Sequence, residues 1–311
     1  METELTRFFL WNVDPVMFHV AGREVRYYSF FFFLVFFLGY FSWHWQMRRA
    51  GHGATPTSRI VLWAFVGVIV SARLGHCLFY EPEFYLSHPL EILNLNRGGV
   101  SSHGATIGIF ITLFLYARRY EYSFLEIADR FSFAGLLGAS LVRIGNFFNS
   151  EIVGREWHGP WAVRFERFAA RSQATWERLH DPLGWTAQPL PRHPAQLYEA
   201  GGILGVLLVL LLVDRRLGEG RPRGLLAGIF CGLYFLVRFN IEFLKEYLRF
   251  KELSPDPVEH VIRILPTTGL TMGQYLSIPF IGIGIAIAVW SLRTRLPAAR
   301  LSRWDTESGD A

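Results

Sequence analysis

The stretch Leu141–Arg155, LVRIGNFFNSEIVGR, ends an apolar segment with an arginine, two asparagines and a glutamate. An arginine at the middle of a membrane costs about 2.5 to 3.5 kcal/mol on insertion scales, so polar groups at the end of a hydrophobic run need partners. Other parts of the chain must therefore supply contacts for Arg143 and Asn146. The pattern of the remaining hydrophobic segments indicates where those contacts come from.

The composition is typical of a membrane protein. Of the 311 residues, 51% are hydrophobic and 16% are aromatic, whereas only 18% are charged. Soluble domains carry about 25% charged residues. The apolar residues fall in blocks of about 20, which is the length that an α-helix needs to cross a bilayer. We therefore expect an all-α polytopic membrane protein with about seven transmembrane helices.

Short polar loops separate the seven expected spans. Their bounds are Tyr28–Trp45, Ile60–Phe79, His103–Ala117, Phe131–Phe148, Gln196–Val213, Gly224–Leu244 and Met272–Leu292. We expect residues 1–311 to form a single integral membrane domain. Within it, residues 149–195 are expected to form a small extracytoplasmic cap, and residues 296–311 a cytoplasmic tail. The prolines of segment 245–271 speak against one continuous helix there.

Basic residues gather after every second span, and this pattern predicts the orientation. They are Arg48, Arg49, Arg118, Arg119, Arg215, Arg216, Arg221, Arg223, Arg293 and Arg295. By the positive-inside rule these ends are cytoplasmic, which places the amino terminus outside and the carboxyl terminus in the cytoplasm. The net charge of +5 therefore reflects membrane topology and lipid contact, and we expect no nucleic-acid partner.

Two further features limit the class of protein. Cys77 and Cys231 both lie inside apolar runs, where a free cysteine behaves as a small hydrophobe. We therefore expect no disulfide framework, no metal site and no cofactor. The amino-terminal residues lack the basic region and small-residue cleavage site of a signal peptide, so the first span is expected to act as the anchor.

With this topology, the polar residues of the spans gather at the outer leaflet. They are Tyr28, Arg73, His76, His103, Arg143, Asn146, Asn149, Gln196, Tyr198, Glu199, Arg238 and Glu242. Taken singly, such residues have ordinary explanations, such as an interfacial tyrosine, a snorkelling arginine or an i, i+4 ion pair between Arg238 and Glu242. As a set they predict an anion pocket, because guanidinium groups match phosphate oxygens in a bidentate manner. A phospholipid headgroup is the natural anion at this depth.

The segments GGVSSHGA, RIGNFFNSEIVGR and RHPAQLYEA resemble the signature segments of the bacterial prolipoprotein diacylglyceryl transferases. VRFNIEFLKE and MGQYLSIP extend the resemblance from about Tyr28 to the final span. It implies an inner-membrane enzyme with seven spans that moves the diacylglyceryl group of phosphatidylglycerol onto the lipobox cysteine of a preprolipoprotein. In that reaction a thioether forms and glycerol phosphate is released.

The resemblance also implies site residues. The family's signature arginine, asparagine, glutamate and glycine match Arg143, Asn146, Glu151 and Gly154, and its loop histidine matches His103. Its sixth-span arginine and glutamate match Arg238 and Glu242. The candidate catalytic residues are His103, Arg143, Arg238 and Glu242, and the candidate substrate-binding residues are Tyr28, Asn146, Asn149, Glu151, Gly154, Gln196, Tyr198 and Glu199. The chain departs from the family at Ser29, at the GGVSSHGA loop, and after Glu242, where the family commonly has FFRxPD.

The implied reaction is displacement at an sp3 carbon by a cysteine thiolate. A thiol has a pKa of about 8.5, so a base helps, and His103 is the candidate. Fixed guanidinium groups stabilise the departing phosphate, which suits Arg143 and Arg238. Two other readings remain: a phospholipid transporter or scramblase, against which the placement at one leaflet speaks, and a catalytically inactive lipid-binding homologue, which the altered loops at Ser29 and Ala105 leave open.

Overall fold

The computed structural model describes residues 8–79, 81–94, 101–168, 190–246 and 270–306, without the side chains of Ser102, His103 and Met272. The middle of the expected cap (169–189), most of segment 245–271 and the end of the expected tail (307–311) lie outside these described residues.

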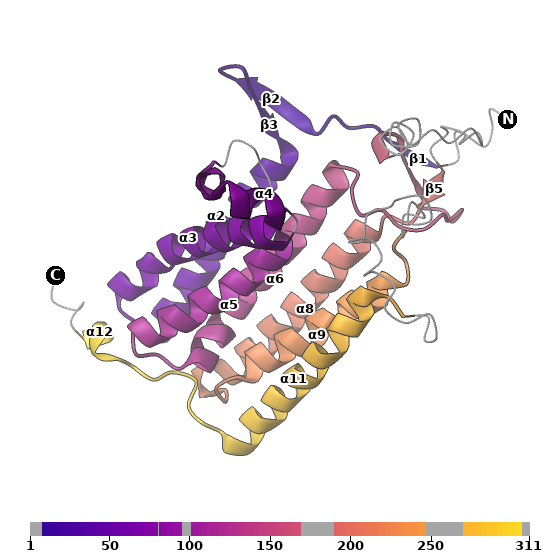
Figure 1. Cartoon of the computed structure of the whole chain (residues 1–311). Helices are drawn as coiled ribbons and strands as arrows, with labels where there is room; N and C mark the ends of the chain where they lie inside the picture. The colour runs from indigo at the N-terminus through magenta and orange to yellow at the C-terminus, as the bar shows by residue number, and fades with distance from the viewer. Residues whose placement is uncertain (1–7, 80, 95–100, 169–189, 247–269, 307–311) are drawn as a thin grey trace.

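Long helices lie side by side and form an elongated bundle (Figure 1). They are α2 Tyr27–Arg49, α3 Ala54–Phe79, α5 Ser102–Arg119, α6 Phe124–Phe148, α8 Ala195–Leu217, α9 Leu225–Glu242 and α11 Met272–Thr294. Among the described residues, six of these helices, all except α5, are long and apolar enough to cross a bilayer. The protein is thus a polytopic membrane protein, and one helix corresponds to each expected span.

Helix α5 takes the place of the third expected span. Its first turn is polar and it ends in two arginines, Arg118 and Arg119, which lowers the mean hydropathy of this 18-residue helix. It nevertheless packs tightly along α3, because glycines line the contact. A Cβ on Gly104 would collide with the carbonyl oxygen of Ser71, and a Cβ on Gly75 would lie 2.8 Å from the Cα of Gly104. Helix α5 is therefore an integral part of the bundle.

The helices alternate in direction, which gives the bundle two distinct ends. Tyr28, at the start of α2, lies against Gly145 near the end of α6, where an added Cβ would be 3.0 Å from the tyrosine ring. At the other end of the bundle, Arg49 closes α2 and pairs with Asp214 near the end of α8 at 2.6 Å. We call these the Arg143 end and the Arg130 end, after an arginine that each contains.

Two small sheets lie outside the helical bundle and were not part of the all-α expectation. Strand β1 (Phe9–Trp11) runs parallel to β4 (Val163–Phe165), which pairs antiparallel with β5 (Pro191–Arg192). Strands β2 (Val16–Val20) and β3 (Arg23–Arg26) form a hairpin. The strands are short, and β1 pairs with residues more than a hundred positions away, so local periodicity gives no sign of them. The β1–β4–β5 sheet covers the Arg143 end.

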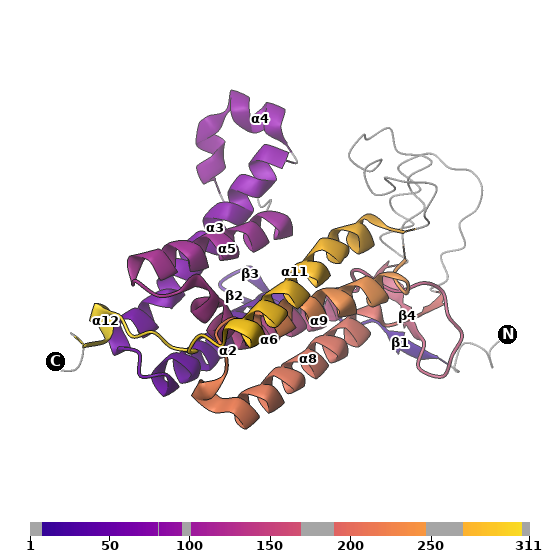
Figure 2. The ribbon, with the colours of Figure 1, turned by 90° about the horizontal axis from the view of Figure 1, so that it is seen from below.

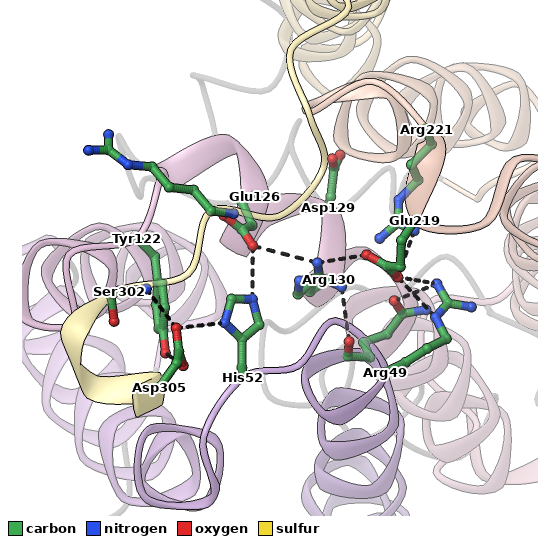
Figure 3. Close-up of polar contacts among 12 residues, drawn as sticks. Arg49, His52, Tyr122, Glu126, Asp129, Arg130, Glu219, Arg221, Ser302 and Asp305 are labelled. Atoms are coloured by element: carbon green, nitrogen blue, oxygen red, sulfur yellow. Dashed lines mark hydrogen bonds and ion pairs between the residues drawn. The ribbon is translucent and has the colours of Figure 1, made fainter. Parts of the chain in front are cut away.

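A buried ionic network closes the Arg130 end (Figure 3). Arg130 of α6 donates to the carbonyl oxygen of Gln46 at 2.9 Å and to Glu219 at 3.0 Å, in the short helix η3 (Gly218–Gly220). Arg221 donates to Asp214 at 2.9 Å. The side chains of Arg130 and Arg221 are completely buried. Every guanidinium in this network that reaches the interior therefore meets a carboxylate or a carbonyl, which offsets its desolvation.

The carboxyl-terminal segment joins the same network through α12 (Arg303–Thr306). Asp305 accepts hydrogen bonds from the hydroxyl of Tyr122 at 2.6 Å and from the amide of Gly53 at 2.9 Å. His52 lies between two carboxylates, with Nε2 2.8 Å from Glu126 and Nδ1 3.3 Å from Asp305. The tail thus binds the turns that connect α2 to α3 and α5 to α6.

Candidate active site

Glu199 lies at the centre of a cluster of charged side chains at the Arg143 end. Its Oε1 is 3.0 Å from Nε of Arg143 and 3.5 Å from Nη1 of Arg238, and its Oε2 is 2.9 Å from Nζ of Lys245. The Glu199 side chain is only 1% exposed. Helices α6, α8 and α9, together with the residues that follow α9, therefore converge on one buried carboxylate.

A second carboxylate completes the cluster. Glu242 lies 3.2 Å from Nη2 of Arg238, one helical turn away, so the pair predicted from the i, i+4 spacing is present. The same carboxylate lies 3.5 Å from Nζ of Lys245. Gly273 at the start of α11 packs directly on Glu242, because a Cβ there would collide with the carboxylate. Glu242 is thus enclosed by α9 and α11.

The two arginines of the cluster are more exposed than its other three charged side chains. The side chains of Arg143 and Arg238 are 18% and 26% exposed, whereas those of Glu199, Glu242 and Lys245 are between 1% and 6% exposed. The carboxylates therefore lie deeper than the arginines, and the two guanidinium groups lie nearer the surface. Because a guanidinium group carries five N–H donors in a fork that matches an oxyanion, this exposed edge of the cluster suits a further anion.

The turn that follows α6 places the amide groups of the signature segment next to Arg143. Asn146 accepts from Nη1 of Arg143 at 3.3 Å and donates to Glu151 at 3.5 Å. Asn149 donates to the other oxygen of Glu151 at 3.4 Å. Ser150 and Ile152 flank Glu151 with positive φ values of 53° and 55°. A left-handed conformation is rare for a β-branched residue such as isoleucine, so this turn holds Glu151 in a strained backbone.

Gly154 is required by the close approach of two chain segments. A Cβ at this position would collide with the carbonyl oxygen of His193, to which the Gly154 amide donates at 3.0 Å. Gly154 also forms an antiparallel bridge with Lys245. The backbone of the signature segment therefore fixes both the start of α8 and the position of Lys245. Only glycine permits this packing.

Gln196 and Tyr198 of α8 contact the cap. Gln196 donates from Nε2 to the carbonyl oxygen of Glu151 at 2.6 Å. The Tyr198 hydroxyl accepts from the indole of Trp161 at 2.6 Å and lies 3.3 Å from Nδ1 of His193. Burial lowers the pKa of His193, so its imidazole is neutral near neutral pH. Both side chains link α8 to the segment that follows α6.

The remaining predicted site residues, Tyr28 and His103, also belong to the Arg143 end. Tyr28 packs beside Gly145, two residues from Arg143. His103 belongs to the first turn of α5, but its side chain lies outside the described residues. Arg73 and His76, which the sequence also grouped at this depth, bind elsewhere: Arg73 donates to the carbonyl oxygens of 91, 92 and 94, and His76 lies 3.4 Å from Glu81.

Lys245 is the member of the cluster that the sequence analysis did not name. It was placed in the charged segment after the sixth span, whose role the sequence did not reveal. A signal was nevertheless present, because Lys245 follows Glu242 by three residues, the spacing at which oppositely charged side chains can pair at a helix end. The structure brings this lysine back because α9 ends at Glu242 and the chain turns toward Gly154.

A family model and individual relatives of known name both match this chain and indicate the same family. The model of the prolipoprotein diacylglyceryl transferase family matches residues 15–290. A relative from Tolumonas auensis is 34% identical over 92% of this chain and 98% of its own length. Relatives from Porphyromonas gingivalis and Vibrio cholerae are 35% and 33% identical, each over 96% of its own length. All three are named phosphatidylglycerol–prolipoprotein diacylglyceryl transferase. The chain therefore belongs to the prolipoprotein diacylglyceryl transferase family.

Proposed function

We propose that this chain transfers the diacylglyceryl group of phosphatidylglycerol to the lipobox cysteine of preprolipoproteins, the first step of lipoprotein maturation. The observation that carries the proposal is the shared pair of buried carboxylates, Glu199 and Glu242, behind the partly exposed Arg143 and Arg238. The names of the relatives supply the two substrates. The cluster supplies a place for the phosphate.

The phosphodiester of phosphatidylglycerol fits between the two arginines. Arg143 and Arg238 both contact Oε1 of Glu199, so their guanidinium groups are held side by side and can bind two oxygens of one phosphate. Lys245 adds a third positive charge from below. Asn146 and Gln196 offer uncharged amides for the hydroxyls of the terminal glycerol, the neutral part of this anionic headgroup.

The cysteine thiolate attacks the glyceryl carbon that carries the phosphate oxygen. The new C–S bond is the thioether, the C–O bond breaks, and its electron pair leaves on glycerol phosphate. Negative charge grows on the phosphate as this bond breaks, and preorganised guanidinium groups stabilise such charge strongly when water is scarce. Glu199, Glu242 and Glu151 position the cations and the amides that make these contacts.

A base is needed for the thiol, and we assign this role to His103 in the first turn of α5. His103→Gln is expected to slow transfer by about 100-fold, because the amide cannot accept the proton. Binding of phosphatidylglycerol should be retained, because the phosphate contacts are made by other residues. Unchanged turnover of a lipobox peptide by this variant would remove His103 from the role of base.

The orientation follows from the loop charges. We propose that the Arg143 end faces the outer side of the bacterial inner membrane, with the amino terminus outside and the carboxyl terminus in the cytoplasm. Helices α2, α5 and α11 end in arginines at the Arg130 end, as does α8. We further propose that residues 1–311 form one membrane domain, with 149–195 as its outer cap and 296–311 as its cytoplasmic tail.

The difference between the two ends of the bundle favours a transferase over a lipid transporter. A transporter that passes headgroups across the membrane needs polar groups accessible from both sides. At the opposite end, Arg130 and Arg221 are completely buried and paired with carboxylates. Arg49 is 27% exposed there, but all three of its guanidinium nitrogens donate to Asp214, Glu219 and Gln46. This asymmetry supports chemistry at one leaflet.

A single experiment tests the proposal. The purified protein is incubated in vesicles with phosphatidylglycerol and a synthetic lipobox peptide, and the peptide mass and released glycerol phosphate are measured. A mass gain of one diacylglyceryl group with an equal amount of glycerol phosphate is expected. Movement of a labelled lipid between leaflets without modified peptide would favour the transporter, and lipid binding without either product would favour an inactive homologue.

A further inference from the structure

The connection between α3 and α5 carries the most exposed large apolar side chains of the described residues. The described part of this connection contains α4 (Pro82–Ser87) and the 3₁₀ helix η1 (Pro89–Leu93). Leu90 and Leu93 are 83% and 80% exposed, and Leu86 is 73% exposed. Exposed apolar groups that gather on one short segment mark a surface that contacts a protein or a membrane.

Arg73 fixes the position of this connection. Its guanidinium donates to the carbonyl oxygens of Glu91, Ile92 and Asn94 at 2.8, 2.9 and 2.9 Å, and its Cζ lies 5.0 Å from the centre of the Tyr85 ring. Arg73 itself is buried in α3. The backbone of η1 is therefore tied to α3, and its leucines cannot turn inward onto the bundle without breaking these bonds.

The two faces of η1 have opposite character. In a 3₁₀ helix, residues three apart lie on the same side, so Leu90 and Leu93 form one apolar face. Glu91 and Asn94 form a second face, where the Asn94 amide donates to the Glu91 carboxylate at 3.1 Å. The segment is thus a short amphipathic element. Such elements lie at a membrane interface with the apolar face in the acyl region.

The membrane surface of the protein continues into this element. Helix α3 spans the membrane, and Leu74, Leu78 and Phe79 in its last turns are exposed. Figure 2 shows that α4 stands out to one side of the bundle, next to the ends of α3 and α5 and away from α8. Because α3 runs from the Arg130 end, its last turns lie at the Arg143 end. The exposed leucines of η1 therefore extend an apolar surface that lipid already covers.

We propose that α4 and η1 form an interfacial anchor, in which Leu86, Leu90 and Leu93 insert into the acyl region of the leaflet at the Arg143 end. The partner is the lipid surface itself, not a protein. Glu91 and Asn94 remain at the level of the headgroups. This anchor is distinct from the phosphate site, and it holds whether or not the chain transfers a diacylglyceryl group.

The anchor also determines the depth at which α5 begins. The amide of Ser101 donates to the carbonyl oxygen of Ala72 at 2.9 Å, one residue before the arginine that holds η1. Gly104 then packs on Gly75. The first turn of α5, which contains His103, is therefore tied to the same part of α3 as the inserted leucines.

The test uses a fluorescent label on each face of η1. In a Cys77→Ala, Cys231→Ala background, Leu90→Cys and the matched control Asn94→Cys are labelled with an environment-sensitive dye in nanodiscs of phosphatidylglycerol and phosphatidylethanolamine. At position 90, emission is expected to shift to the blue and to be quenched by lipids with a nitroxide on the acyl chain. At position 94, quenching by aqueous iodide is expected, since the Arg73 contact uses only the backbone carbonyl there.

Equal quenching by iodide at both positions, with water-like emission at position 90, would overturn the proposal. Leu93→Cys provides a second reading of the apolar face if Leu90→Cys does not give a monodisperse protein. Quenching by acyl-chain nitroxides at positions 90 and 93 but not at 94 supports the anchor. Protection of position 90 from both quenchers would show that protein covers this face, which also contradicts insertion into lipid.

Discussion

The two ends of the bundle each hold a cluster of charged side chains, and the two clusters have different roles. At the Arg130 end, Arg130 and Arg221 are completely buried, and their partners include carboxylates and backbone carbonyls. Arg49 is 27% exposed, but Asp214, Glu219 and Gln46 bind all three of its guanidinium nitrogens. At the Arg143 end, Arg143 and Arg238 share one buried carboxylate and remain partly exposed. The first cluster joins helices, whereas the second presents cations to a ligand.

The difference shows how burial distinguishes a structural ion pair from a binding site. A ligand cannot reach the donors of a completely buried arginine, and removal of one partner of a buried pair leaves an uncompensated charge. In the cluster around Arg143, the two carboxylates and Lys245 are the buried members, and the two arginines are the partly exposed ones. This order leaves the arginines fixed but accessible, as preorganised stabilisation of a phosphate requires.

The largest expected effect is loss of activity from Arg143→Ala. One of the two guanidinium groups on the phosphate disappears, and arginines that neutralise a transferring phosphoryl group are worth about 10³ to 10⁵ in rate. Transfer to a lipobox peptide should therefore fall by at least about 10³-fold. The thermal melting temperature in detergent should change little, because Glu199 keeps Arg238 and Lys245 as partners. A fully active variant would contradict the anion pocket.

Arg130→Ala is the matched substitution at the other end, with the opposite outcome. It leaves the buried Glu126 and the partly exposed Glu219 without one of their cations. Removal of one partner of a buried pair costs about 3 to 5 kcal/mol. The melting temperature should drop clearly. Turnover per folded molecule, measured well below the melting temperature, should stay close to that of the unchanged protein. If activity fell and stability did not, the distinction between the two clusters would be wrong.

The sequence alone predicted the long helices and the pairing of one of the two site arginines. Six spans agree with long apolar helices, because about 20 apolar residues are a strong local signal. The pairing of Arg238 with Glu242 followed from helical spacing. The sheets were missed because Phe9 pairs with Val163, a contact without local pattern. Lys245 was missed for a related reason, since it follows a helix end and its position depends on a bridge to Gly154.

The central position of Glu199 was also beyond the sequence. The motif gave it as a substrate-binding candidate, but not as the carboxylate that joins three cations. Such a role depends on where α6, α8 and α9 meet, and helix packing is a tertiary property that spacing within one helix does not encode.

Substitution of Lys245 tests how the charges at the Arg143 end position the two arginines. Lys245→Met removes the positive charge behind Glu199 and Glu242 but keeps the length of the side chain. The two carboxylates should then draw the arginines inward, and activity should fall by about 10-fold, as is usual for groups that orient those in contact with a substrate. The KM for phosphatidylglycerol should rise more than kcat falls.

Lys245→Arg is the matched control, because it keeps the positive charge and should therefore keep most of the activity. A purely structural lysine would predict a different pattern, in which both variants lower the melting temperature and neither changes the KM. Equal activity of the methionine variant and the unchanged protein would exclude Lys245 from the site.

The smallest effect concerns pH and the tail at the Arg130 end. Burial alone would raise the pKa of Asp305, but hydrogen bonds from Tyr122 and from the amides of Gly53 and Ser302 lower it below its usual value. Because the folded pKa lies below the unfolded one, the stabilisation by this carboxylate is complete above about pH 4 and is lost as the pH falls through the folded pKa. The melting temperature should therefore decline below about pH 4, and Asp305→Asn should flatten that decline. An equally steep decline in the unchanged protein and in Asp305→Asn would show that the Asp305 carboxylate does not cause the loss of stability at low pH. The stability of the Arg130 end would then depend on the ion pairs among α2, α6 and α8.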